Sequence, residues 1–142
     1  MPVREASHPV AVALILFLTL ALLLPPLSAK TRPAPALDSG YVSALAGADR
    51  FLQAWQSGDV ESGIVLLSGH AKGKVTTDGI EKFFSNSGPS AYEIGRGKLL
   101  KRGRYEFPVV LVSISKNHAR RKFSSIVIVD TGKNDWAVDK LP

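Results

Sequence analysis

The stretch Ala48–Asp59, which reads ADRFLQAWQSGD, decides the fold. It ends a longer segment, Tyr41–Gln56, in which apolar residues recur at the spacing of one helical face. Gly58 follows at the position where a helix commonly ends in the left-handed conformation, and Asp59 is a residue type that caps the start of a helix. The stretch therefore predicts two helices that meet at a tight corner.

The second of these two helices runs from the corner to an end near His70, because apolar residues continue to that point. Asp78, followed three residues later by Glu81, resembles a capping box and predicts the start of a third, short helix that runs through Phe84. The N-terminal part of the domain is thus helical.

From residue 91 the apolar period changes from helical to strand-like. Short connections rich in charge and turn formers separate four predicted strands, which makes sequential strands antiparallel neighbours. Pro108 must then lie at a bulge or where its missing N–H is not needed. The fold class is α+β, with two to three N-terminal helices packed on a curved four-stranded antiparallel sheet. The predicted strands are Ala91–Leu100, Tyr105–Ser115, Lys122–Val129 and Trp136–Leu141.

The two central strands are apolar on both faces. Helices can cover only one face, so we expect a second copy to cover the other and form a homodimer through the sheet. The alternative, in which curvature and the termini shield that face within a monomer, stays open. One apolar set is Val110, Val112, Ile114, Ile126 and Ile128; the other is Phe107, Val109, Leu111, Phe123, Val127 and Val129.

The N-terminal segment predicts export. The run Val10–Leu24 is apolar apart from Thr19, and its length fits either a cleaved signal or a membrane anchor. The expected location is extracytoplasmic: secreted, periplasmic or anchored by this one N-terminal helix. The predicted parts are a signal peptide or single anchor at residues 1–29, with residues 10–27 in the membrane if uncleaved, a Pro/Ala-rich linker at residues 30–38, and the α+β domain at residues 39–142.

The composition excludes several kinds of bond, site and partner. The sequence has no cysteine, which excludes disulfides, a lipidated N-terminal cysteine and a zinc–thiolate site. Its basic residues form two clusters at opposite ends of one predicted strand, an arrangement that does not make a single nucleic-acid groove, so no nucleic acid is expected as a partner. They are solvated hairpin tips or a polyanion-binding surface. The clusters are Arg96, Lys98, Lys101, Arg102 and Arg104, and Lys116, His118, Arg120, Arg121 and Lys122.

The predicted order of elements resembles the nuclear-transport-factor-two-like (NTF2-like) superfamily, also called the cystatin-like α+β cone. The similar segments are the corner Ala48–Asp59, of the type FLxAWxxGD, and the closing Asn134–Val138, NDWAV, of the type xWxVxxL. The resemblance covers residues 39–142 and suggests a small exported or membrane-anchored member. It implies a curved sheet wrapped around helices, often with a pocket and frequently with a dimer formed through the sheet.

The resemblance carries over no catalytic set, and we predict no catalytic residue, cofactor or metal. With His70 and His118 as the only histidines of the domain, a histidine metal site is not expected. Aromatic walls with two hydroxyls, and His70 with Asp78 as an acid–base pair, still suggest a pocket, although core packing and helix capping explain the same residues. The candidate pocket residues are Phe51, Trp55, His70, Asp78, Tyr92 and Tyr105.

We therefore expect a non-catalytic, exported or membrane-anchored interaction or ligand-binding domain with an unknown ligand. Two alternatives stay open. One is a small cone-fold enzyme, an isomerase or dehydratase-like lyase that uses a buried carboxylate or His70. The other is a domain that binds polyanions through its basic surface.

Overall fold

The computed structural model describes residues 38–86, 88–116, 118–132 and 135–142. The described residues all belong to one compact unit. The predicted signal or anchor and most of the predicted linker lie outside the described residues. Among the helices that are described, none is both long and apolar enough to cross a membrane.

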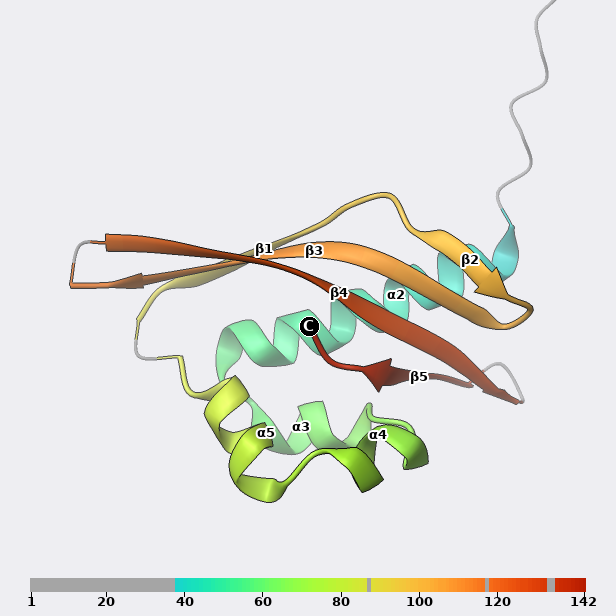
Figure 1. The fold of residues 1–142 in the computed structure, drawn as a ribbon, viewed down its shortest axis with the longest axis horizontal. Helices are drawn as coiled ribbons and strands as arrows, with labels where there is room; N and C mark the ends of the chain where they lie inside the picture. Colours follow the sequence, from blue (N-terminus) through green and yellow to red (C-terminus); the bar gives the residue numbers. More distant parts are fainter. Residues whose placement is uncertain (1–37, 87, 117, 133–134) are drawn as a thin grey trace, which may run out of the picture. The chain divides into compact units, whose positions relative to one another are not determined.

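In the described part of the chain, four helices precede the sheet (Figure 1). The longest, α2, ends at the predicted corner, where Gly58 adopts a φ of 69° and Asp59 accepts a hydrogen bond from the Ser62 amide at 3.0 Å. Both residues thus have their predicted capping roles. Hydrogen bonding by Ser62, first through its side chain and then through its backbone amide, lowers the pKa of Asp59. The helices are α2 (Ser39–Ser57), α3 (Val60–Val65), α4 (Gly69–Lys74) and α5 (Thr77–Phe84).

The second predicted helix is too long. Helix α3 ends at Val65, and Leu67 forms a parallel bridge with Val138 in the last strand, so the segment after α3 extends the sheet instead of the helix. Ser68 then caps α4 by accepting from the Ala71 amide at 3.0 Å, which places His70 in a first helical turn and not at a helix end.

Helix α5 also starts differently from the prediction. Thr76 is its N-cap, accepting from the Gly79 amide, and Asp78 lies in the first turn. Gly63 of α3 explains how the two short helices pack. A Cβ atom at this position would lie 2.0 Å from the Phe84 ring, so only glycine permits the approach.

The sheet has five strands among the described residues, because the segment predicted as the first strand, Ala91–Leu100, is divided between two strands. The break at Gly95–Gly97 lies opposite Pro108, whose carbonyl accepts from the Gly95 amide at 2.8 Å. The backbone nitrogen of Pro108 therefore faces the break between β1 and β2 and not β4, so its missing N–H removes no hydrogen bond between β3 and β4. The strand order is β1-β3-β4-β5, with β2 also paired to β3. The strands are β1 (Ser90–Ile94), β2 (Lys98–Lys101), β3 (Arg104–Ser115), β4 (His118–Gly132) and β5 (Asp135–Lys140).

Strand β4 is longer than predicted. Residues His118–Arg121, expected in a connection, pair with β3, and the turn begins at Lys116 with a φ of 48°. The β3–β4 hairpin consequently extends past the helices at one end of the sheet (Figure 1).

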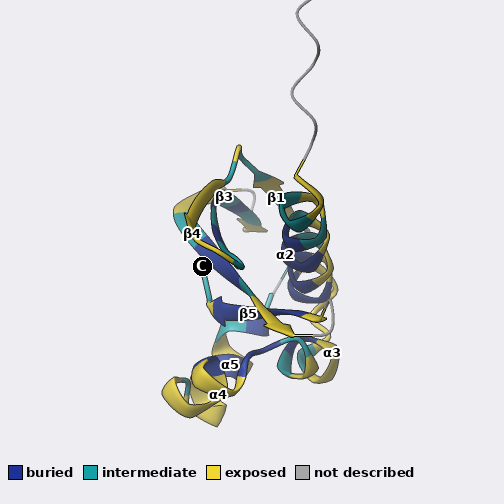
Figure 2. Ribbon diagram, turned by 90° about the vertical axis from the view of Figure 1, so that its right-hand side faces the viewer, coloured by how far each residue is buried: buried dark blue, intermediate teal, exposed yellow. Residues whose placement is uncertain are grey.

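The strand register also corrects the predicted faces. Ile126 pairs with Phe107 and Ile128 pairs with Tyr105, and all four residues are buried in the core that also contains residues of α2. Figure 2 shows the buried stretches of β4 and α2 in dark blue. Cross-strand partners share a face. Val110, Val112 and Ile114 therefore share the outer face with Phe123, Val127 and Val129, whereas the two isoleucines belong to the core.

The core between the sheet and α2 is filled with apolar side chains. Phe51 and Trp55 are buried in it, which confirms that the corner segment of α2 is structural. The Trp55 indole N–H donates to the carbonyl of Phe83 at 3.0 Å and so ties α2 to α5.

Candidate functional site

One cavity is lined by residues of α5 and of the part of the β3–β4 hairpin that extends past the helices. Its volume is about 680 Å³, within the range of small-molecule sites. The aromatic side chains Trp55 and Phe83 and the apolar Leu111 form part of its wall. The full lining is Trp55, Gly79, Lys82, Phe83, Ser85, Asn86, Leu111, Ser113, Arg120, Arg121 and Lys122.

Four of these lining residues are cations, and no carboxylate lines the cavity. Arg120 pairs with Ser113 and Lys122 with Leu111 across the hairpin, so both basic side chains belong to the helix-facing side of β4. Lys122 lies 5.9 Å from the centre of the Phe83 ring, a cation–π distance. We call this cavity, with its apolar wall and its basic residues Lys82, Arg120, Arg121 and Lys122, the cationic cleft.

Local structure holds the wall of the cationic cleft in place. The Asn86 side-chain amide donates to the Trp55 carbonyl, which fixes the segment after α5 against the end of α2. Phe83 stacks on Phe51, with ring centres 6.0 Å apart. The rigid wall and the exposed basic side chains together suit a ligand that has an apolar body and a negative charge.

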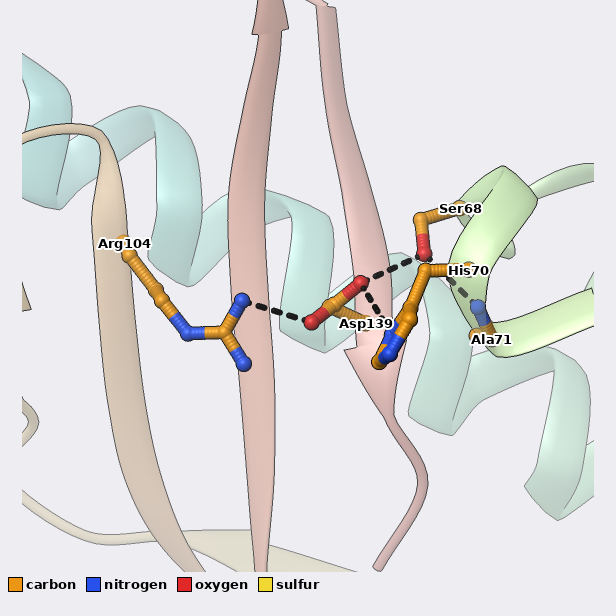
Figure 3. Close-up of polar contacts among 5 residues, drawn as sticks. All are labelled: Ser68, His70, Ala71, Arg104 and Asp139. Carbon is orange, nitrogen blue, oxygen red and sulfur yellow. Dashed lines mark hydrogen bonds and ion pairs between the residues drawn. The ribbon is translucent and has the colours of Figure 1, made fainter. Parts of the chain in front are cut away.

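A second polar cluster surrounds Asp139 of β5, on the other face of the sheet (Figure 3). Arg104 reaches across β4 to this carboxylate at 2.6 Å, and Ser68 donates to it at 2.7 Å. The imidazole of His70 lies 3.1 Å from the same carboxylate. Burial acts to raise the pKa of Asp139, but Ser68, Arg104 and His70 together lower it below the ordinary value.

This cluster is an anchor by its geometry. Asp139 is buried, and its partners come from β3, from the segment that joins α3 to α4 and from the first turn of α4. The backbone of that segment pairs with β5, since Ser68 donates to the Val138 carbonyl and Val138 donates to Leu66. A carboxylate with a lowered pKa is a weak base, so this site does not provide the raised pKa that the enzyme hypothesis needs.

The six residues of the predicted pocket do not lie around one cavity. Trp55 lines the cationic cleft, whereas Phe51 is enclosed in the core. His70 contacts Asp139 and not Asp78, which is exposed in the first turn of α5.

The two candidate tyrosines have carboxylate partners on or next to α2. Tyr92 donates to Asp49 at 2.7 Å; burial, followed by this hydrogen bond, raises the pKa of Tyr92 to about 12. Tyr105 donates to Asp38, and this hydrogen bond, followed by burial, raises the pKa of Tyr105 to about 12. Both hydroxyls therefore remain protonated at neutral pH and act as donors.

Tyr105 lines a second cavity of about 660 Å³ at the other end of the sheet. Its charged lining is mixed, with Asp38 and Asp130 beside Arg102, and it lacks the single sign of the cationic cleft. The basic clusters thus lie at opposite ends of β3, as predicted, and the cavity beside the hairpin turn differs from the second cavity in having no acidic residue in its lining.

Sequence reasoning identified part of the cationic cleft. It found Trp55 and the basic run near the hairpin turn, but it placed that run in a loop and did not connect it to α5. Lys82 and Asn86 carried no signal because their role depends on how α5 packs beneath the hairpin. Asp139 was missed because an acidic residue in an edge strand is ordinarily solvent-facing.

Known proteins resemble this domain in fold and not detectably in sequence. No family model matches the chain, and no curated protein matches it. A crystal structure of an NTF2-like protein of unknown function from Shewanella oneidensis MR-1 matches 69% of this chain and 93% of that one, with a TM-score of 0.51 and 9% identity. The S. rosetta CaMKII hub matches 75% of this chain and 94% of that one, with a TM-score of 0.50 and 16% identity.

These similarities confirm the fold class that the sequence predicted. The domain has the NTF2-like fold, an α+β cone in which helices precede an antiparallel sheet. This fold is compatible with a ligand-binding domain.

Proposed function

We propose that this protein is a non-catalytic ligand-binding domain that is exported or held at a membrane by residues 10–27, and that its ligand is a small organic anion bound in the cationic cleft. The cleft carries the proposal, because an apolar wall and four basic residues, with no acidic residue, line one cavity, and the side chains of Arg120 and Lys122 belong to its helix-facing side. The apolar run Val10–Leu24 supports export.

The arrangement of the cleft indicates how such a ligand binds. Trp55, Phe83 and Leu111 offer apolar contact to the body of the ligand, while arginine and lysine pair with its carboxylate or phosphate. Among the described residues, the side-chain ion pairs use His70, Lys98 and Arg104, so no side-chain carboxylate pairs with any of the four cleft cations. Lys122 does donate to the backbone oxygen of Pro142 at 3.3 Å.

Binding of 2-naphthoate, an aromatic carboxylate, tests this proposal. Calorimetry should give saturable one-to-one binding, and the Trp55 indole N–H resonance should shift while that of Trp136 does not. The neutral 2-naphthamide should bind at least about tenfold more weakly, since the loss of one charged hydrogen bond costs about 1.5–3 kcal/mol.

Matched variants locate the site. Lys82→Gln and Arg120→Gln should each weaken naphthoate binding by about tenfold or more. Lys72→Gln, an exposed lysine of α4 outside the cleft, should leave it unchanged. Equal affinity for naphthoate and naphthamide, or equal effects of the three variants, would overturn the proposal.

Polyanion binding is a second candidate, favoured by the run of basic residues from Lys116 to Lys122. It makes a different prediction, because affinity for polyphosphate should rise with chain length and fall steeply with salt. A single cleft for a small anion gives a fixed stoichiometry and only a modest salt dependence.

We also propose a homodimer through the outer face of the sheet. Phe123 is 76% exposed there and Ile114 is 43% exposed, and the partly buried Val110 pairs with Phe123. Phe123→Glu should shift sedimentation from dimer to monomer, since it places a charge in an apolar interface. A protein that sediments as a monomer before the substitution would refute the dimer.

A further inference from the structure

The N-terminal half of β4 has an edge to which no strand of the described residues is paired, and the residues after β5 contact its inner part through a hydrogen bond from Lys122 to the Pro142 backbone oxygen at 3.3 Å. β5 pairs with β4 only from Val127 to Gly132, so His118–Ile126 has β3 as its sole strand partner among the described residues. No backbone hydrogen bond of the described residues outside the named strands and helices uses this segment. An unpaired edge of this length presents a row of amide and carbonyl groups to which another strand can bind.

The register shows which amides point outward. On β3, the Pro108 carbonyl accepts from Gly95 and the Ile114 amide donates to Pro89, so the even-numbered residues of β3 direct their backbone groups away from β4. Because paired positions alternate between hydrogen-bonded and non-hydrogen-bonded in antiparallel strands, their partners on β4 also point away from β3. Those partners are Ala119, Arg121, Phe123 and Ser125.

The side chains along this edge differ between its two faces. His118, Arg120 and Lys122 belong to the helix-facing side, where they form a basic row. Ala119 and the exposed Phe123 belong to the outer side, which is mainly apolar apart from Arg121. A strand that alternates acidic and apolar residues would match both faces at once, because side chains of paired strands share a face.

We propose that this edge binds an extended segment of a partner protein in which acidic and apolar residues alternate, and that the segment adds to the sheet as a strand beside β4. Charge selects this occupant over a second copy of the chain, since two identical edges would bring their basic residues together. The edge shares Arg120 and Lys122 with the cationic cleft, but strand addition also requires the outward amides in the plane of the sheet, which a ligand of the cleft does not need.

Amide exchange of the full chain tests the proposal with a ten-residue acetylated peptide that alternates Glu and Val. In the free protein, the amides of Ala119, Arg121 and Phe123 should exchange rapidly, while those of Arg120 and Lys122 should be protected by β3. Saturating peptide should slow the first group at least about tenfold, since each of these amides then donates to a strand. Naphthoate should not slow them.

Two peptides and three variants complete the test. A Lys–Val peptide, and a Glu–Val peptide N-methylated on alternate residues facing the edge, should bind at least tenfold more weakly. Arg120→Glu combined with Lys122→Glu should weaken binding by a similar factor. Arg121→Pro, which removes an outward N–H that β3 does not use, should abolish binding, whereas Arg121→Ala should weaken it only a few-fold.

The results that would refute strand addition differ from those that would refute the cationic cleft. Failure of the Glu–Val peptide to bind, or binding that leaves the amides of Ala119, Arg121 and Phe123 in fast exchange, would refute strand addition. Because the charge-reversed variant changes only exposed side chains, it keeps the test valid even if Arg121→Pro fails to fold. Loss of naphthoate binding with intact peptide binding would refute only the cleft.

Discussion

The two halves of β4 have opposite surroundings. From Val127 onward the strand pairs with neighbours on both sides, and Ile126, Val127 and Ile128 are buried. From His118 to Phe123 it pairs with β3 alone, and every residue is exposed. One continuous strand thus contributes to the core at one end and carries a basic, unpaired edge at the other. Stability and binding are separated along its length.

The largest expected effect comes from a pair of phenylalanines in the two regions. Phe107 is fully buried opposite Ile126, whereas Phe123 is 76% exposed. Phe107→Ala should lower the free energy of unfolding by about 3–5 kcal/mol, through lost burial and a cavity. Phe123→Ala should change it by about 0.5 kcal/mol or less. Urea unfolding of both variants at one low protein concentration measures the contrast, and similar losses would contradict it.

The second expected effect concerns the anchor of the buried half, Asp139. Asp139→Asn should cost about 3 kcal/mol at pH 7, at the low end of the range for a broken buried ion pair, because Arg104 is partly exposed. The lowered pKa of Asp139 sets the pH dependence. Its contribution is fully present above the unfolded pKa of about 3.9 and disappears as pH falls through the lower folded pKa.

Unfolding of wild type and Asp139→Asn between pH 7 and pH 2 measures this dependence. The difference in stability between them should shrink as the solution becomes more acidic. A difference that stays constant from pH 7 to pH 2 would show that the carboxylate charge is not what anchors β5. Asp78→Asn, an exposed carboxylate of α5, is the control.

The sequence predicted the buried elements of the molecule better than the exposed half of β4, for a physical reason. Apolar periodicity and the caps at Gly58 and Asp59 are local signals, and they located the first helix, the corner and the antiparallel sheet. The end of α3 was missed because Leu67 joins the sheet through a distant bridge to Val138. The reach of β4 to His118 was missed because charged residues next to a turn resemble a loop.

The residues of the candidate site divide in the same way, into those that a local sequence pattern identified and those that it did not. Trp55 was found because it lies on a periodic apolar face, and the basic run was found because it is contiguous. Their proximity to Lys82 could not be found, since no local pattern reports that α5 lies beneath the hairpin. The faces of β4 were misassigned by one position because the pairing of Phe107 with Ile126 depends on the length of the hairpin turn.

The smallest expected effect is the change in folding stability when one cation is replaced in each basic cluster, and its sign differs between the two clusters. Lys98 has an ion-pair partner, Glu106, at 2.9 Å, and this hydrogen bond, followed by that from Ser125, lowers the pKa of Glu106. Lys98→Gln should therefore destabilise the fold by a few tenths of a kcal/mol, about the value of an exposed ion pair. Arg120 lies among other cations with no such partner, so Arg120→Gln should stabilise the fold by about the same amount through reduced repulsion.

Added salt screens both electrostatic effects, and raising sodium chloride from about 0.05 to 0.5 M should bring both variants to the wild-type midpoint of thermal unfolding. Destabilisation by Arg120→Gln that persists at high salt would mean that the exposed half of β4 contributes to folding after all, and the separation of stability from binding along this strand would fail.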